Sequence, residues 1–216
     1  MKRTLPLAIV ITMVALFFFS DSASWAAPKP CPTSAFPDLT NSAGAGAGYS
    51  KPTISVTCTK TELQVSSNGM ISFAFEQKTP NPLNPQNLNW SVPLNPVKAK
   101  SATTIRNVLG TLGFTVSGLP IYGPTEGQQP AAQAFGDPVF NNILDMCGGH
   151  TGPGREYHHH ALTLVDPCNL SKQSILGYAL DGFPIYTTLG CMDKKCTKTA
   201  TMKSGYVKTG DPTTNT

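Results

Sequence analysis

The stretch Leu176-Gly-Tyr-Ala-Leu-Asp-Gly-Phe-Pro-Ile-Tyr186 is typical of a β-hairpin. Apolar residues that favour strands lie on both sides of Asp181-Gly182, and an Asp-Gly pair between two such runs indicates a tight turn. The second half of this stretch resembles a segment earlier in the chain: Gly118-Leu-Pro-Ile-Tyr122 differs from Gly182-Phe-Pro-Ile-Tyr186 at one residue. A turn glycine, a proline, and then Ile and Tyr on opposite faces are typical of an edge strand. Two interpretations are open: similar strands that flank one site and each offer a tyrosine, or a chance recurrence.

Further strand signals predict a mainly β domain, sandwich-like or irregular. β-branched and alternating residues mark the expected strands, which cover 53–58, 63–66 and 70–75, with one or two more between 104 and 116. Asn68-Gly69 predicts a hairpin turn between the second and the third of these strands.

Two stretches depart from this strand pattern. Prolines and asparagines dominate residues 79–97, which predicts an ordered loop or edge segment rather than a helix. Apolar residues between Pro130 and Met146 predict a helix, which Pro138 should split or restart. The expected fold is therefore mainly β with one or two short helices, and it is stapled by disulfides.

The beginning of the chain predicts export. Met1-Lys2-Arg3 is basic, Leu5 to Phe19 is an apolar run, and Ser24 and Ala26 are small, which is the pattern of a secretory signal peptide cleaved before Ala27. The apolar run of about 15 residues is shorter than the roughly 20 that a membrane anchor needs. We therefore expect a secreted or periplasmic/extracellular protein without a membrane span after cleavage of residues 1–26.

The mature chain divides into three parts. Residues 27–50 are rich in Pro, Gly, Ala and Ser, which predicts a flexible lead-in to the β-rich domain at 51–190. Residues 191–216 are polar, and their Thr-rich end leads us to expect a truncated chain. The net charge of the full sequence is +4. No basic stripe is interleaved with aromatic residues, which argues against nucleic acid as a partner.

All six cysteines follow the expected cleavage site. An even number of cysteines in an exported chain predicts disulfides, although six cysteines allow about 15 connectivities. Their order along the chain favours the pairs Cys31–Cys58, Cys147–Cys168 and Cys191–Cys196, the last of which closes a very short loop. Cys147 as a thiolate metal ligand is the alternative that an oxidising compartment disfavours.

All four histidines fall within eleven residues, at His150, His158, His159 and His160. If 157–160 is a strand, His158 and His160 share one face while His159 points away. The glycine-rich loop from Gly148 to Gly154 can turn the chain so that His150 joins the pair. Three neutral imidazoles suit Zn or Cu, so we interpret His150, His158 and His160 as metal ligands. A hydrogen-bonded network of His, Tyr and Asp side chains remains the alternative.

Three blocks resemble the YHYH domain family of secreted proteins: Asp145-Met-Cys-Gly-Gly-His150, Gly154-Arg-Glu-Tyr-His-His-His160 and the hairpin at 176–186. The resemblance covers roughly residues 66–187. Tyr157, His158 and His160 match the motif that names the family, whereas its second tyrosine is His159 here. The resemblance implies a site in an exported β-rich domain and names no reaction.

Three functions remain open. The first is a metal-binding domain whose ligands are surrounded by further polar side chains, in which carboxylates would hold imidazole N–H groups. These expected neighbours are Asp145, Asp181, Tyr122 and Tyr186. The second is a metal-dependent hydrolase or oxidoreductase that uses Tyr157, Glu156 or Asp181 as acid or base. The third is a surface interaction module without metal, for an unknown small molecule or surface partner.

Overall fold

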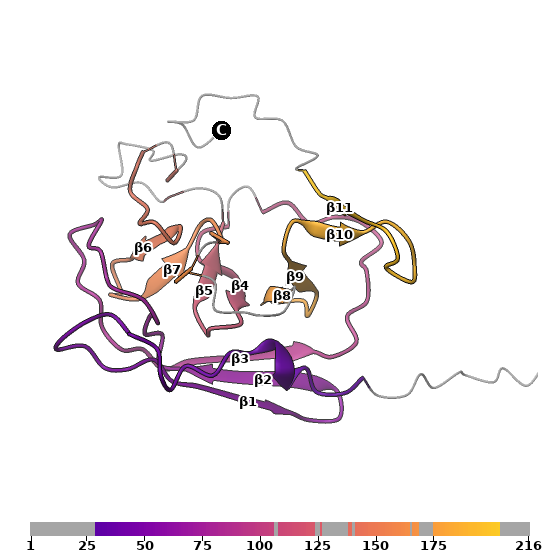
Figure 1. The fold of residues 1–216 in the computed structure, drawn as a ribbon, viewed down its shortest axis with the longest axis horizontal. Coiled ribbons are helices and arrows are strands. Elements are labelled where there is room, and N and C mark those ends of the chain that lie inside the picture. Colours follow the sequence, from indigo (N-terminus) through magenta and orange to yellow (C-terminus); the bar gives the residue numbers. More distant parts are fainter. Residues whose placement is uncertain are drawn as a thin grey trace, which may run out of the picture.

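The computed structural model describes residues 29–105, 108–123, 126, 138–139, 141–164, 166–168 and 175–203. Within these residues the regular secondary structure consists almost entirely of strands, which form three sheets (Figure 1). The helical element of this part of the chain is a short 3-10 helix, η1 (Thr33–Ala35). The expected mainly β, disulfide-stapled fold is therefore confirmed. The expected signal peptide, residues 1–26, lies outside the described residues.

The helix predicted at 130–146 is not found in its described part. Residues 138, 139 and 141–146 form turns and bends, and the others lie outside the described residues. Asn142 has a φ of 52°, in the left-handed region that interrupts a right-handed helix. The Asp145 carboxylate also accepts hydrogen bonds from the backbone of Cys147 and Gly149, which favours a turn there.

Three antiparallel strands form the first sheet in the order β1-β2-β3: β1 (Ile54–Cys58), β2 (Glu62–Ser67) and β3 (Leu88–Pro93). The predicted strands at 53–58 and 63–66 are confirmed. β3 is an edge strand within 79–97, where a loop or edge segment was expected. Alternate residues of β2 are buried, so one face of this sheet packs on the core.

The strand predicted at 70–75 is wrong, because this segment forms no strand. β2 pairs with β1 on one side and with β3 on the other, so neither of its edges is open to a hairpin partner. Gly69 does turn the chain, with a φ of 64°, but the chain then enters the core. Met70, Ile71 and Phe73 are buried there without ladder pairing.

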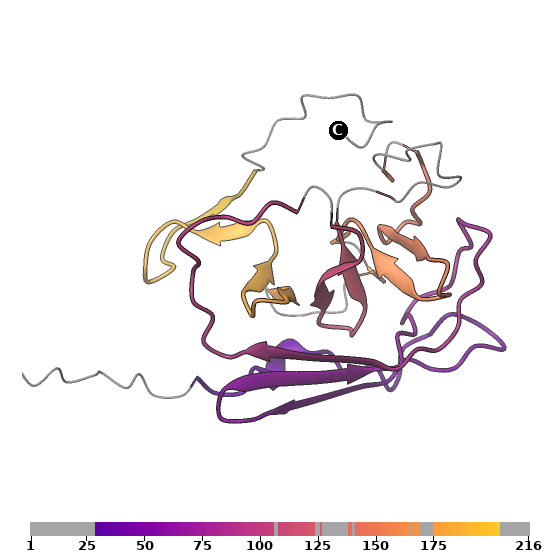
Figure 2. The ribbon, with the colours of Figure 1, turned by 180° about the vertical axis from the view of Figure 1, so that it is seen from behind.

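The second sheet has six strands in the order β6-β7-β5-β4-β8-β9. Its strands are β4 (Thr111–Thr115), β5 (Pro120–Tyr122), β6 (Gly149–Thr151), β7 (Tyr157–His159), β8 (Ile175–Ala179) and β9 (Pro184–Tyr186). β5 and β7 are parallel, and the other pairs are antiparallel. A separate hairpin joins β10 (Leu189–Cys191) and β11 (Thr199–Thr201). Figures 1 and 2 show the first sheet as a layer along one side of the second.

The two similar segments, 118–122 and 182–186, belong to two similar hairpins. The β4–β5 hairpin (112–122) and the β8–β9 hairpin (176–186) pair through β4 and β8, with Phe114 opposite the equivalent Tyr178. Both hairpins have a register shift at the same position, just before Gly113 and Gly177. A side chain at either glycine would collide with the carbonyl oxygen of Tyr178 or Phe114, so glycine permits the close pairing of the two copies.

The three disulfides follow chain order, with Cys31–Cys58, Cys147–Cys168 and Cys191–Cys196 all formed. No cysteine is free. These bonds indicate an oxidising, extracytoplasmic compartment.

The described part of the expected flexible lead-in, residues 29–50, contributes to the core. Cys31 ties it to the end of β1, and Ala45 packs in the cluster around Met70. The part of the chain that the structure describes has no helix with the length and apolar character needed to cross a bilayer.

Candidate metal centre

The β6–β7 hairpin brings the histidines together. His150 pairs directly with His158 across the antiparallel ladder, and His160 follows two residues later. The Nε2 atom of His158 lies 3.1 Å from Nε2 of His150 and 3.1 Å from Nε2 of His160. The strand expected at 157–160 is found as β7 (Tyr157–His159), and it points the imidazoles of His158 and His160 at one place.

Glu126 completes the cluster and was not predicted from the sequence. Its Oε1 atom lies 3.0 Å from Nε2 of His150 and 2.6 Å from Nε2 of His160. The residue stands four positions after Tyr122, the last residue of β5, and β5 is parallel to β7. A parallel pairing of these two short strands has no local signature in the sequence, so no pattern linked Glu126 to the histidines.

The four atoms form a ring with separations of 2.6–3.1 Å between neighbours, and all lie within 4.8 Å of one another. Bonds of ~2.0–2.1 Å to one ion would leave neighbouring ligand atoms ~2.8–3.0 Å apart in a square and ~3.3–3.4 Å apart in a tetrahedron. The separations between neighbouring atoms are therefore close to those of a square set of ligands around one transition-metal ion.

Two of the imidazoles are oriented by the backbone. The Nδ1 atom of His150 lies 3.0 Å from the carbonyl oxygen of Ile143, and that of His160 lies 2.6 Å from the carbonyl oxygen of Gly123. A carbonyl only accepts, so each Nδ1 carries a proton, and in the Nδ1–H tautomer the lone pair lies on Nε2. The Nε2 atoms converge on one another and on the Glu126 carboxylate, an arrangement that could hold a metal ion.

The surroundings of His158 and Glu126 favour the protonation states that can bind a metal. The pKa of His158 is lowered to about 3, first by burial and then by the neighbouring His150 and His160. Burial raises the pKa of Glu126, but the neighbouring His150 and His160 outweigh it, and the net pKa lies well below the usual range. At neutral pH the site thus combines a neutral imidazole at His158 with an ionised carboxylate at Glu126.

Tyr122 and Glu156 lie beside the centre. The ring of Tyr122 stacks on the ring of His158, with centroids 3.9 Å apart and planes 16° from parallel. Its hydroxyl donates to Oε1 of Glu156 at 3.3 Å, and the same oxygen lies 3.7 Å from Nδ1 of His158. Burial, followed by the charge of Glu156, raises the pKa of Tyr122 to about 12.

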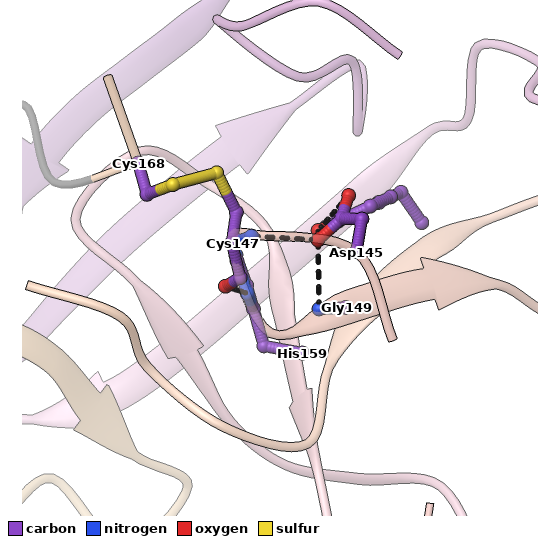
Figure 3. The surroundings of a disulfide bond; sticks show 6 residues. Asp145, Cys147, Gly149, His159 and Cys168 are labelled. Carbon is purple, nitrogen blue, oxygen red and sulfur yellow. Dashed lines mark hydrogen bonds between the residues drawn. A yellow bond between two sulfur atoms is a disulfide. The ribbon is translucent and has the colours of Figure 1, made fainter. Parts of the chain in front are cut away.

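The structure places the other expected neighbours elsewhere. The Asp145 carboxylate accepts the backbone N–H groups of Cys147 and Gly149 (Figure 3). It also accepts the hydroxyl of Tyr157, and burial raises its pKa. Asp181 lies in the exposed turn between β8 and β9. Tyr186 is 56 % exposed on β9, which β4 and β8 separate from β5.

His159, the departure from the family motif, faces away from the cluster. Its Nδ1 lies 3.1 Å from the carbonyl oxygen of Cys147, beside the Cys147–Cys168 disulfide (Figure 3). Its pKa is lowered to about 4, chiefly by burial. The alternation expected of a strand is therefore observed.

A cavity of about 620 Å³ adjoins the cluster of His150, His158, His160 and Glu126. Its lining includes Tyr122 and Glu156 as well as apolar side chains such as Pro80, Leu109 and Ile143. A small molecule that entered this cavity would therefore reach the cluster.

A family model matches the C-terminal part of the chain. Residues 89–216 match the model of the family described as YHYH protein. No curated protein and no solved structure matches the chain. The matched region covers more than half of the sequence and contains the whole β6–β7 hairpin with its histidines. The chain belongs to the YHYH protein family.

Proposed function

We propose that this protein is exported and binds one transition-metal ion, Zn or Cu, through His150, His158, His160 and Glu126. The observation that carries the proposal is the convergence of imidazole nitrogens and a carboxylate oxygen with neighbouring separations of 2.6–3.1 Å. Three nitrogen donors and one oxygen donor suit both ions, with a tetrahedral site favouring Zn and a tetragonal site favouring Cu(II).

Elemental analysis tests this proposal. Wild-type protein is purified, reconstituted separately with Zn and Cu, and compared with a His158→Ala/His160→Ala double variant. We expect about one ion per chain in the wild type and far less in the variant, which keeps only two of the four ligands. Absence of metal from both proteins after reconstitution would leave the non-metal interaction module as the better account.

The cavity favours one extension, a metal-dependent hydrolase or oxidoreductase. An enzyme of this kind needs room for a substrate next to the ion, and a volume of about 620 Å³ adjoins the ligand atoms. A panel of ester, phosphoester and redox substrates, tested with the reconstituted protein, separates an enzyme from a binding domain. Turnover that the double variant lacks would support the enzyme, and no turnover would favour binding alone.

A further inference from the structure

The three imidazoles of the cluster are held in two different ways. Backbone carbonyls anchor Nδ1 of His150 and of His160, at 3.0 and 2.6 Å. Nδ1 of His158 is also buried, yet it has no hydrogen-bond partner among the described residues. The charged atom facing it is Oε1 of Glu156, at 3.7 Å. His158 thus has a carboxylate where the other two imidazoles have a backbone carbonyl.

The Glu156 carboxylate is enclosed by its own loop. Its side chain is 17 % exposed, and it lies against Gly152 and Gly154 of the turn between β6 and β7. A Cβ atom added to either glycine would collide with the carboxylate oxygens. The backbone N–H of Gly152 donates to the carbonyl of Glu156 at 2.9 Å, which closes the loop around the side chain. The two glycines therefore make room for a carboxylate at this position.

Tyr122 holds the same two residues from the other side. Its ring lies flat on His158, and its hydroxyl donates to Oε1 of Glu156. One tyrosine on β5 therefore limits the motion of the imidazole and of the carboxylate together. This leaves Glu156 aimed at the Nδ1 side of His158.

We infer that Glu156 is the positioning residue of the metal centre, whose carboxylate accepts the Nδ1–H of His158 and so directs the Nε2 lone pair at the ion. The inference rests on the proposed function. Nδ1 of His158 and Oε1 of Glu156 lie 3.7 Å apart, so a hydrogen bond of ~3.2 Å between them needs a movement of about 0.5 Å. A carboxylate partner fixes the tautomer of a ligating histidine and makes it a stronger donor. Glu156 acts through His158 and lies on the side of that ring away from the four converging atoms.

Three variants test the inference by Zn²⁺ competition with a chromogenic chelator. Glu156→Ala removes the acceptor and should weaken Zn²⁺ binding ~10–100-fold, the usual cost of losing an outer partner of a metal ligand. Glu156→Gln keeps the size and an acceptor oxygen but not the charge, so its loss should be smaller. Glu62→Gln removes an exposed carboxylate on β2 and is the matched control, with unchanged affinity expected.

A second readout reports the tautomer of His158 directly. Nitrogen-15 NMR of the metal-free protein should show His158 protonated at Nδ1 in the wild type and in Glu156→Gln, and a mixture of tautomers in Glu156→Ala. A wild type that binds no metal contradicts the proposed function and leaves this NMR test of the inference intact. A wild type that binds Zn²⁺, with unchanged affinity in both Glu156 variants, overturns the inference alone. If Glu156→Ala does not fold, unchanged Zn²⁺ affinity in Glu156→Gln overturns it.

Discussion

Two adjacent histidines of β7 face opposite environments. His158 points to Glu126 and the other imidazoles, whereas His159 lies against the carbonyl of Cys147. We predict that His159→Tyr, which restores the family motif, leaves metal affinity nearly unchanged. His158→Ala and His160→Ala should each weaken it at least ~10-fold, because each removes a ligand rather than an outer partner. Metal titration of the three variants checks this. A loss in His159→Tyr as large as that in His160→Ala would contradict the ligand set.

Glu126 provides the second prediction at this scale. Its carboxylate is the anionic member of the four, so Glu126→Gln should weaken Zn²⁺ binding at least ~10-fold while the fold persists. Glu62→Gln again serves as control, since it removes the same charge from an exposed position on β2. Competition titration measures the affinities. Equal Zn²⁺ affinity in the two variants would show that Glu126 is not a ligand and that the histidines alone bind the ion.

The difference between the histidines and Glu126 shows what the sequence can predict about a site. His158 and His160 are two residues apart, so strand periodicity alone places them on one face. Glu126 reaches the same point through a parallel pairing of β5 with β7, which involves Ile121 and His159. Long-range pairing of this kind depends on the packing of the whole sheet. The same limit explains why Asp145 could not be assigned to the Tyr157 hydroxyl beforehand.

Strands and turns could likewise be predicted where the signal is local, and not where it depends on distant segments. The hairpin at 176–186 was predictable because its Asp-Gly turn and apolar runs are contiguous. Residues 70–75 have a strand-like composition, yet β1 and β3 already occupy both edges of β2. Competition for an edge is decided by strands far apart in the chain. A local pattern therefore predicted the turn at Asn68-Gly69, but it could not predict that residues 70–75 are not part of any sheet.

The repeated hairpin gives a prediction at the scale of elements. Gly113→Ala and Gly177→Ala should each lower the free energy of unfolding by about 1–3 kcal/mol, because each methyl group meets a carbonyl oxygen of the paired copy. Gly46→Ala is the comparison, since nothing lies within 4 Å of its Cβ position and only its left-handed backbone adds a cost. Urea unfolding with the disulfides intact measures all three. A smaller loss at both strand glycines than at Gly46 would contradict the close pairing.

For the whole molecule, the three disulfides were predictable because each joins cysteines that are neighbours in chain order. They tie the lead-in to β1, the segment before β6 to the one after β7, and the ends of one short loop. Such bonds require an oxidising compartment. The layering of the two sheets had no comparable signal in the sequence, since it depends on which faces pack.

Export provides the prediction at this scale. We expect the protein isolated from its native host to begin at Ala27 and to contain no free thiol. Intact mass measures the first property and thiol titration under denaturing conditions measures the second. A retained Met1, or several titratable cysteines in native material, would contradict export through a cleaved signal peptide.

The central claim is that one metal ion lies among four named atoms. Crystals of the Zn- or Cu-reconstituted protein, measured on both sides of the absorption edge of the metal, locate the ion without reference to activity. The account predicts one anomalous peak ~2.0–2.2 Å from Nε2 of His150, His158 and His160 and from a carboxylate oxygen of Glu126. No peak at that position, or a peak bound by other side chains, would contradict it.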